Sequence, residues 1–379
     1  MDIVCFCHLR WDFVYQRPQH LLSRFAKTYR VFVIEEPVFS DQKPFLSVDA
    51  KDEQLIVLTP NLNLGEDQKE IIAGQQKLLS AYFQSSGLRD YILWYYTPMA
   101  MPLASALPAP SLTVYDCMDE LSAFKFAPPD IQERESRLME AADIMFTGGY
   151  TLFEAKKNAH KNIHAFPSSI DKEHFRKART LTNLPVEYSA IPLPRIGFFG
   201  VVDERFDIEL LRNLSAARPD WHFIIIGPIV KIDPAILPVA DNIHYQGGRT
   251  YTELPEHLAA WQVALIPFAI NESTEFISPT KTPEYLAGGK PVVSTPIKDV
   301  VTPYGEKELV YIASNAAEFE KGIEWGLQIR DDPGWKKNVD DFLAVISWDI
   351  TWNNMMNLIR EALDSKQVLN LLKKPNEYV

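Results

Sequence analysis

Short apolar runs recur along the first half of the chain, and most are followed by a stretch whose apolar residues repeat at helical spacing. The segment RPQHLLSRFAK shows this helical pattern, because Leu21, Leu22 and Phe25 recur on one helix face and Pro18 suits a first helical turn. Another helix is predicted over roughly residues 66–84. Strands that alternate with helices predict βαβ units and a mostly parallel sheet, with strands in DIVCFC, RVFVIEEP, QLIVLTP, YILWYYTP, SLTVYDC and IMFTGG.

The same alternation restarts after a polar, proline-marked stretch over residues 179–194, which we interpret as an interdomain linker. The second half offers strands in RIGFFG, WHFIIIGP, NIHYQGG, VALIPF, PVVST and ELVYIA. A last helix is predicted from about residue 348 to residue 364. The predicted fold class is α/β, with two doubly wound domains facing a cleft. The first domain spans residues 1–183 and the second residues 190–347.

Length and composition agree with this division. The 379 residues exceed one ordinary core, and 46% hydrophobic with 23% charged residues is the composition of a globular protein. A net charge of −12 argues against nucleic acid as a partner. Four cations lie on or near the first predicted helix: Arg17, Arg24, Lys27 and Arg30. They either form a local basic patch or are ordinary surface charges.

The N-terminus and the cysteines indicate a cytoplasmic protein. MDIVCFCHLRWD lacks the basic start and long apolar core of a signal peptide and is predicted to be a first strand. No apolar run is long enough to span a bilayer. Of three cysteines, Cys5 and Cys7 share one strand face and cannot bridge easily, which fits a reducing compartment.

Polar residues gather after strands of the second domain. In open α/β sheets, ligands bind beyond the carboxyl ends of the strands. Gly200 follows RIGFFG and would let backbone N–H groups approach an anion, and Arg205 lies shortly after it. Arg249 and Tyr251 follow NIHYQGG. The segment over residues 271–284 follows VALIPF, so these loops are the predicted ligand site.

The stretch FISPTKTPEYLAGGKPVVS places a short helix between this loop and a buried strand. Thr280 or Thr282 can cap that helix, and Pro283 suits its first turn. Unpaired N–H groups at its start favour a phosphate, Lys281 adds a full charge, and Glu284 can accept hydrogen bonds from two ribose hydroxyls. Together these features suit a nucleoside diphosphate. The alternative is that Glu284 is a favourable first-turn carboxylate and Lys281 a solvated loop residue.

Two carboxylates, Asp116 and Asp119, mark the end of a strand in the first domain, within VYDCMDELSAF. Either could bind ligand hydroxyls or act as a base. Asp119 is equally compatible with a helix N-cap. The first loop carries aromatic residues that suit either a stacking platform for a ligand or interdomain packing, namely Trp11, Phe13 and Tyr15. His8 and His20 flank that loop and can face the cleft or be packed.

The segment SPTKTPEYLAGGKPVVS resembles the donor-binding segment of GT-B glycosyltransferases, in particular the retaining, family-four or "glycosyl transferases group 1" type. The matching positions are Pro279, Lys281, Glu284 to Ala287, Gly289 and Lys290 to Val293. Three further segments resemble family elements in the same order: FPSSIDKEHF, NIHYQGGRTYTELPEHLAAWQVALIPF and SWDITWNNM. The resemblance implies two Rossmann-like domains, with a C-terminal helix over residues 352–379 crossing back to complete the first.

The resemblance places Lys281 and Arg205 on the donor diphosphate, Glu284 on the ribose, and the backbone around Arg249 and Tyr251 near the base. The family's glycine pair after the first strand is replaced by RWDFVYQRPQHLL, from which Gln16 or Arg17 would reach the phosphates. The donor-binding candidates are Arg17, Gly200, Arg205, Arg249, Tyr251, Thr274, Thr280, Lys281 and Glu284.

One family position differs. Relatives carry a glutamate eight positions before the one matched by Glu284, and Phe276 stands there. Either Glu275 takes its role through a one-residue shift, or loop amides with Asn271 or Thr274 hold the sugar. The catalytic candidates are Asp116, Asp119 and Glu275.

The resemblance implies a hexosyltransferase that moves a sugar from a nucleotide-sugar donor, UDP-linked or else GDP-linked, to a polysaccharide, glycolipid or small-molecule acceptor. It implies retention, a bacterial cell-envelope setting and peripheral contact with the inner membrane face. No tightly bound cofactor is expected, and no metal, because the chain has no Asp-x-Asp pair and no His/Cys cluster with ligand spacing. The alternatives are a sugar-nucleotide epimerase and a non-catalytic nucleotide- or partner-binding protein. A dinucleotide oxidoreductase is disfavoured, because no G-x-G-x-x-G follows either first strand.

Overall fold

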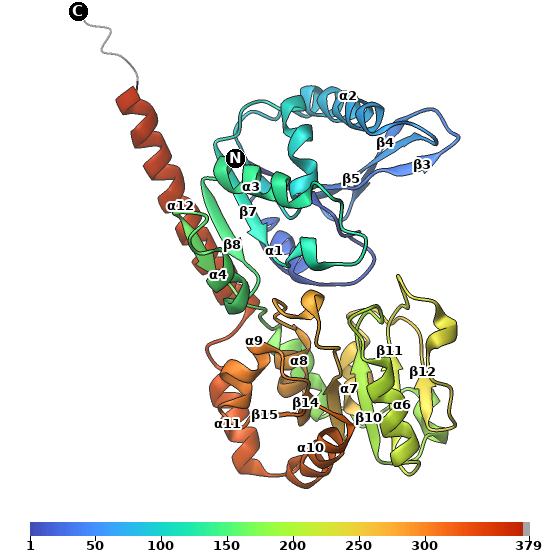
Figure 1. Cartoon of the computed structure of the whole chain (residues 1–379). Helices are drawn as coiled ribbons and strands as arrows, with labels where there is room; N and C mark the ends of the chain where they lie inside the picture. Colours follow the sequence, from blue (N-terminus) through green and yellow to red (C-terminus); the bar gives the residue numbers. More distant parts are fainter. Residues whose placement is uncertain (374–379) are drawn as a thin grey trace, which may run out of the picture.

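The computed structural model describes residues 1–373 and contains two α/β domains (Figure 1). The N-terminal sheet has the strand order β3-β5-β2-β1-β6-β7-β8-β9, and every neighbouring pair in it is parallel. Strand β4 pairs antiparallel with β5 at the outer edge. The strands are β1 (Asp2–Cys7), β2 (Arg30–Glu35), β3 (Val38–Ser40), β4 (Phe45–Ala50), β5 (Leu55–Asn63), β6 (Tyr91–Tyr95), β7 (Leu112–Cys117), β8 (Ile144–Thr147) and β9 (Ile163–Ala165).

Helices cover both faces of this sheet. The capping box of Asp67 and Glu70 starts helix α2, and Gly87, with φ of +72°, ends it in the left-handed region. The predicted helix over residues 66–84 is therefore confirmed. The helices are α1 (Arg17–Phe25), α2 (Gln68–Ser86), η1 (Pro98–Ala106), η2 (Leu121–Ala123), α3 (Ile131–Ala141) and α4 (Tyr150–Lys156).

The C-terminal sheet is parallel throughout, in the order β12-β11-β10-β13-β14-β15. Its strands are β10 (Arg195–Phe199), β11 (His222–Ile226), β12 (Ile243–Tyr245), β13 (Val263–Ile266), β14 (Val292–Ser294) and β15 (Val310–Ile312). Its longer helices are α5 (Lys172–Arg176), α6 (Ile208–Ala217), α7 (Leu254–Ala259), α8 (Lys281–Ala287), α10 (Ala316–Ile329) and α11 (Pro333–Leu343). Its short turns are η3 (Lys177–Arg179), η4 (Val186–Ala190), η5 (Pro234–Ile236), η6 (Glu272–Thr274), α9 (Lys298–Val300) and η7 (Val301–Gly305).

The chain passes between the domains twice. On the first passage Phe166 packs against the N-terminal core and Ile170 lies in the C-terminal core. On the return, Ile346 packs on the C-terminal core and Trp348 lies in the N-terminal one. The backbone N–H of Trp348 donates to the carbonyl of Ile170 at 3.1 Å, and this hydrogen bond ties the two passages together.

The first passage comes earlier than the sequence indicated. The supposed linker over residues 179–194 packs on the C-terminal domain, because Tyr188 is 1% exposed in that domain's core. The hydroxyl of Tyr188 lies 2.9 Å from Nδ1 of His257. The linker prediction was therefore wrong: its polar and proline residues surround one buried aromatic anchor. Packing places the boundary between residues 166 and 170 rather than at residue 183.

Helix α12 (Trp348–Lys373) runs back along the N-terminal domain, as Figure 1 shows. Trp348, Met355, Met356 and Ile359 are each at most 2% exposed in the N-terminal core. This burial explains why the final helix is long, since its apolar stripe completes the core against α1 and β7.

Side-chain contacts join the two domains at the base of the cleft. The carboxylate of Asp299 accepts from the backbone N–H groups of Tyr150 and Thr151, both at 2.9 Å, and so caps α4 from the opposite domain. The rings of Tyr15 and Tyr251 stack with centroids 4.6 Å apart. Tyr15 of the first loop therefore contributes to interdomain packing, which is one of the two roles predicted for that loop.

Candidate functional site

The larger chamber of the interdomain cleft lies at the carboxyl ends of both sheets. It has a volume of about 630 Å³, and we call it the Asp119 chamber. This is where open α/β sheets bind ligands. Its walls include residues one to four positions after strands of both domains: His8, Thr97, Met118, Asp119, Gly148, Val201, Val230 and Phe268.

A second chamber, of about 600 Å³, lies against the C-terminal sheet, and we call it the Glu284 chamber. Loops after β10, β11 and β12 line it, together with the start of α8 and residues 11–15 of the first loop. The two chambers share Phe13, Val14, Thr280 and Lys281. A ligand can therefore extend from one chamber into the other past the Lys281 ammonium.

Lys281 and Glu284 lie three residues apart on α8, so both side chains point from one helix face into the Glu284 chamber. Glu284 is 5% exposed, yet its carboxylate has no hydrogen bond or ion pair with residues 1–373. Lys281 makes only a 3.5 Å contact with the Thr280 hydroxyl within that range. Burial raises the pKa of Glu284 and lowers that of Lys281, and each charge partly offsets the effect on the other.

At two glycines in the wall of this chamber, no side chain covers the backbone. Gly200 has φ of +154° and Gly227 has φ of +146°, in the region that side chains rarely adopt. A Cβ atom on Gly227 would lie 1.7 Å from the Gly200 carbonyl oxygen. The turns after β10 and β11 therefore require glycine. Because glycine has no side chain, a ligand in the chamber can approach the backbone at these turns.

Arg205 is held in place at the border of the Asp119 chamber. Its guanidinium donates to both carboxylate oxygens of Asp203, with the shortest contact at 2.7 Å. It also lies 5.3 Å from the ring of Phe124, which belongs to the opposite domain. The sequence placed Arg205 in the predicted ligand site but did not identify Asp203 as the residue that holds its guanidinium at the cleft.

Arg17 and Asp116 form a buried ion pair, with Nη2 of Arg17 2.8 Å from the Asp116 carboxylate. Asp116 is 0% exposed and Arg17 is 4% exposed. A further N–H group of Arg17 donates to the carbonyl of Phe166 at 2.6 Å. The expectation that Asp116 offers a free carboxylate to the cleft was therefore wrong, because both carboxylate oxygens bind Arg17.

The supposed basic patch on α1 is also absent from the described structure. Arg17 is buried in its ion pair, and Arg24 and Arg30 pair with Asp349 and Asp2 at 2.9 and 2.6 Å. Arg17 and Arg24 on α1 are therefore structural, whereas Arg30 lies on β2 and Lys27 is an exposed residue after the helix.

Asp119, in contrast, faces the cleft with no hydrogen bond or ion pair to its carboxylate among the described residues. Burial raises its pKa to about 6, against the opposing effect of Arg205, Arg17 and Lys281. It makes no side-chain cap for η2, whose preceding residue is Glu120. Asp119 is thus the carboxylate of the N-terminal domain that is available to a ligand.

Three other predicted residues play supporting roles. The guanidinium of Arg249 turns from the chamber to Glu187, at 3.1 Å, although its backbone lines the wall. Tyr251 also lines the chamber and stacks between Tyr15 and His174. Thr280 borders both chambers and makes no side-chain cap, so neither threonine caps α8 as expected.

The loop before α8 differs most from expectation. Glu275 is 44% exposed and pairs with Lys298 at 2.7 Å, outside both chambers. The hydroxyl of Thr274 donates to the carbonyl of Ala269 at 2.6 Å, inside the loop. The turn η6 accounts for both, since it directs Glu275 outward and uses Thr274 to close the loop.

Sequence reasoning missed several cleft residues. Phe124 and Lys231 meet across the Asp119 chamber, with the ammonium 5.4 Å from the ring centroid. No local motif marks either position, because each depends on how the domains face each other. His8 does line this chamber, and burial lowers its pKa to about 4, so it is neutral there.

Known proteins resemble this chain in sequence. Residues 194–328 match the family model described as Glycosyl transferases group 1. The chain is 24% identical over 283 residues, 70% of each chain, to a Bacillus subtilis (strain 168) protein whose name places it in teichuronic acid biosynthesis as a glycosyltransferase.

Two solved structures share the whole fold. Sucrose-phosphate synthase from Thermosynechococcus elongatus has a TM-score of 0.69 at 14% identity, covering 96% of this chain and 100% of that one. A trehalose-6-phosphate protein from E. coli, bound with UDP-2-fluoro glucose, has a TM-score of 0.66 at 12% identity, covering 96% and 99%. The two-domain fold predicted from the sequence is confirmed.

Residues 1–373 contain neither a membrane span nor a metal cluster. No helix in that range combines the length and apolar character needed to cross a membrane. Nor does any group of three or more His, Cys, Asp or Glu side chains there have an arrangement that could hold a metal ion.

Proposed function

We propose that this chain, which is a glycosyltransferase of the GT-B fold, transfers a sugar from a nucleoside-diphosphate donor to a glycan, glycolipid or small-molecule acceptor. UDP is the favoured nucleotide, with GDP as the alternative. The bound UDP-2-fluoro glucose of one structural neighbour supports UDP. The name of the Bacillus relative supports an acceptor in cell-envelope polysaccharide synthesis.

One observation carries the donor site: Lys281 and Glu284 face a chamber without protein partners among the described residues, while Arg17 and Arg205 beside them are paired. A buried carboxylate and a buried ammonium are costly unless something binds them. A diphosphate at Lys281 and ribose hydroxyls at Glu284 would supply those partners.

The proposed chemistry is electrostatic. As the bond from the sugar to the diphosphate breaks, negative charge accumulates on the leaving group, and Lys281 with the oriented Arg205 stabilises it. Because the side chains of Lys281 and Arg205 can balance the negative charge of the diphosphate, the proposal includes no metal. Retention of configuration is proposed from the family resemblance.

Asp119 is the proposed group for the acceptor hydroxyl. With its pKa raised to about 6, the carboxylate is ionised at neutral pH and basic enough to accept a proton or a hydrogen bond. It faces the same chamber as Arg205, so a hydroxyl bound there would lie near the leaving diphosphate.

Thermal unfolding with UDP, GDP, ADP and their sugar conjugates tests the donor site. A nucleotide at 100 times its Kd adds about 2.7 kcal/mol to the unfolding free energy. We expect one diphosphate to stabilise the protein, and Lys281→Ala and Glu284→Ala to remove that stabilisation. Lys307→Ala and Glu256→Ala, which change exposed residues of the same domain, are the matched controls and should keep it.

The rival functions have distinct outcomes. If no nucleotide at millimolar concentration shifts the transition, the catalytic proposal fails and a non-catalytic protein is favoured. Conversion of a sugar nucleotide to its epimer without any acceptor would instead identify a sugar-nucleotide epimerase.

A further inference from the structure

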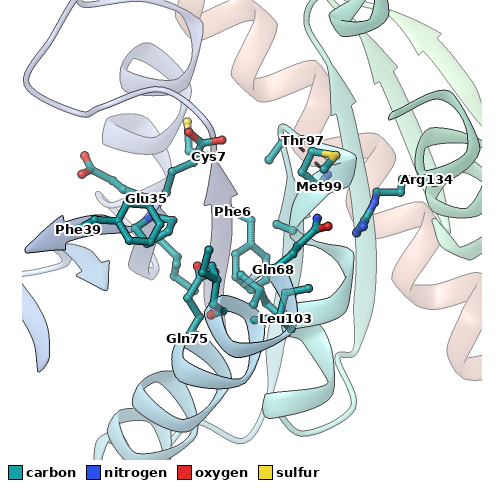
Figure 2. Close-up of a pocket in the computed structure, with 16 residues that line it drawn as sticks. Phe6, Cys7, Glu35, Phe39, Gln68, Gln75, Thr97, Met99, Leu103 and Arg134 are labelled. Carbon is teal, nitrogen blue, oxygen red and sulfur yellow. Dashed lines mark hydrogen bonds between the residues drawn. The ribbon is translucent and has the colours of Figure 1, made fainter. Parts of the chain in front are cut away.

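A separate cavity of about 280 Å³ lies inside the N-terminal domain, and we call it the Phe6 pocket (Figure 2). It opens between the ends of β1 and β2 on one side and α2, η1 and α3 on the other. Its apolar wall consists of Phe6, Ile34, Pro37, Phe39, Ile71, Ile72, Met99, Ala100 and Leu103. The volume is close to the lower limit of about 300 Å³ for small-molecule sites, so it suits one apolar group.

The Phe6 pocket adjoins the catalytic cleft. Glu36, Thr97 and Met99 line both the pocket and the Asp119 chamber. A ligand that fills the pocket can therefore continue past these three residues toward Asp119. The chamber offers Asp119, Arg205 and Lys281 to a sugar, whereas most residues of the pocket wall are apolar, with its polar members at or beside the rim shared with the chamber and along α2 and α3.

Polar side chains at the pocket retain bonding capacity. Gln75 is 6% exposed, and within the described residues its amide makes only a 3.4 Å contact with the carbonyl of Ile71. Arg134 binds Asp130 through Nε, and its terminal nitrogens have no hydrogen bond with residues 1–373. Figure 2 shows both residues bordering the pocket. These groups can orient a ligand whose main contact is apolar.

The adjoining surface is also apolar. Phe39 on β3 and Val48 on β4 are 41% and 52% exposed, and both lie on the sheet face that carries their β5 partners Leu62 and Leu58. Phe39 belongs both to this surface and to the pocket wall. An apolar chain longer than the pocket would therefore still meet apolar side chains at the entrance.

From these observations, and resting on the proposed function, we propose that the acceptor is an amphiphilic glycoside. Its alkyl chain occupies the Phe6 pocket and its sugar lies in the Asp119 chamber. The inference narrows the acceptor class, because a free polysaccharide or a small sugar has no group to fill the pocket.

Titration calorimetry with n-alkyl β-D-glucosides, from methyl to octyl and below micelle-forming concentrations, tests this proposal. Each methylene that enters the pocket should strengthen binding about fourfold, until the pocket is full. Ala100→Phe fills the pocket and should abolish the dependence on chain length. Ala81→Phe, on the exposed face of α2, is the matched control and should retain it. Phe39→Ala, at a residue that is 41% exposed, should weaken octyl glucoside binding without unfolding the domain.

The titration needs no nucleotide, so it separates this inference from the donor proposal. Stabilisation by UDP with equal affinity for methyl and octyl glucosides overturns the inference alone. A dependence on chain length that survives in folded Phe39→Ala and Ala100→Phe proteins also overturns it. If Ala100→Phe does not fold, Phe39→Ala decides. If the protein binds alkyl glucosides in a chain-length-dependent way but binds no nucleotide, the Phe6 pocket does not serve an acceptor and the inference is overturned. The inference is supported if alkyl glucoside affinity depends on chain length in the parent, if that dependence is lost in Phe39→Ala and Ala100→Phe, and if UDP still stabilises these variants.

Discussion

Two pairs of opposite charges lie near the cleft, one in each domain, and the fold treats them in opposite ways. Arg17 and Asp116 of the N-terminal domain bind each other, 2.8 Å apart, and both are buried. Lys281 and Glu284 of the C-terminal domain are also enclosed, but neither is in an ion pair with the described residues. The first pair is complete without a ligand, and the second is not.

This difference separates a structural role from a ligand-binding role at sites that look alike in the sequence. The N-terminal domain offers Arg17 at the start of α1 and Asp116 near the end of β7, and the C-terminal domain offers Lys281 and Glu284 in the first turn of α8. Removing a charge from the paired site should cost mainly stability, because the partner stays buried. Removing one from the unpaired site should cost mainly ligand affinity. The following experiments test that division.

The largest effect is expected for Asp116→Ala. The variant leaves the Arg17 guanidinium buried without its counter-charge, which should lower the unfolding free energy by about 3–5 kcal/mol. Urea denaturation followed by tryptophan fluorescence measures the change. Asp349→Ala is the control, since the Asp349 carboxylate that binds Arg24 is 63% exposed and should contribute less than about 1 kcal/mol. Equal losses in the two variants would contradict the structural role of Asp116.

A smaller effect is expected from the unpaired carboxylate. If Glu284 binds the ribose, the protein should prefer UDP over 2′-deoxy-UDP by at least about tenfold, because one hydrogen bond to a charged group contributes about 1.5–3 kcal/mol. Glu284→Gln should weaken UDP more than 2′-deoxy-UDP, which retains only the 3′-hydroxyl contact, so that the preference shrinks. Calorimetric titration of both nucleotides gives the answer. An equal loss for both nucleotides would place Glu284 away from the 2′-hydroxyl.

Asp119 should give the activity a dependence on pH. With a pKa of about 6, the ionised fraction rises about tenfold between pH 5 and pH 7, and kcat/KM should rise with it. UDP release from the active sugar nucleotide measures the profile, and Asp119→Asn should lose the rising limb. A variant that retains the limb would show that another group titrates.

The same group should affect stability in the opposite direction. Its pKa in the folded protein lies above the usual value near 3.8, so its contribution to stability is full in acid and is lost as pH rises through about 6. Asp119→Asn should therefore be more stable than the parent at pH 8, on the order of 1 kcal/mol, and equal to it at pH 4. Urea denaturation at the two pH values tests the sign.

The smallest effect is expected at Glu275. Because this carboxylate is half-exposed and paired with Lys298, Glu275→Gln should change kcat/KM by less than about twofold. Steady-state kinetics beside the Asp119→Asn variant measure it. A loss beyond tenfold would mean that the loop rearranges on donor binding and that Glu275 does take the place of the glutamate missing at Phe276.

Local patterns in the sequence determined a large part of this protein. The alternation of strands and helices was enough to predict two parallel-sheet domains, because each βαβ unit is specified by nearby residues. Lys281 and Glu284 could be grouped from the sequence alone, since three residues of separation place them on one helix face. The glycine after β10 was also identifiable, because only a turn with close backbone contact requires it there.

Only the tertiary structure decided which charges remain free. Arg17 finds Asp116 across 99 positions of the chain, and no spacing rule connects them. Tyr188 converts a polar stretch into part of a core, and η6 turns Glu275 outward, through contacts that depend on the packed domain. The Phe6 pocket is likewise assembled from segments far apart in sequence. Short-range periodicity specifies secondary structure, whereas the availability of a side chain depends on partners that only folding brings together.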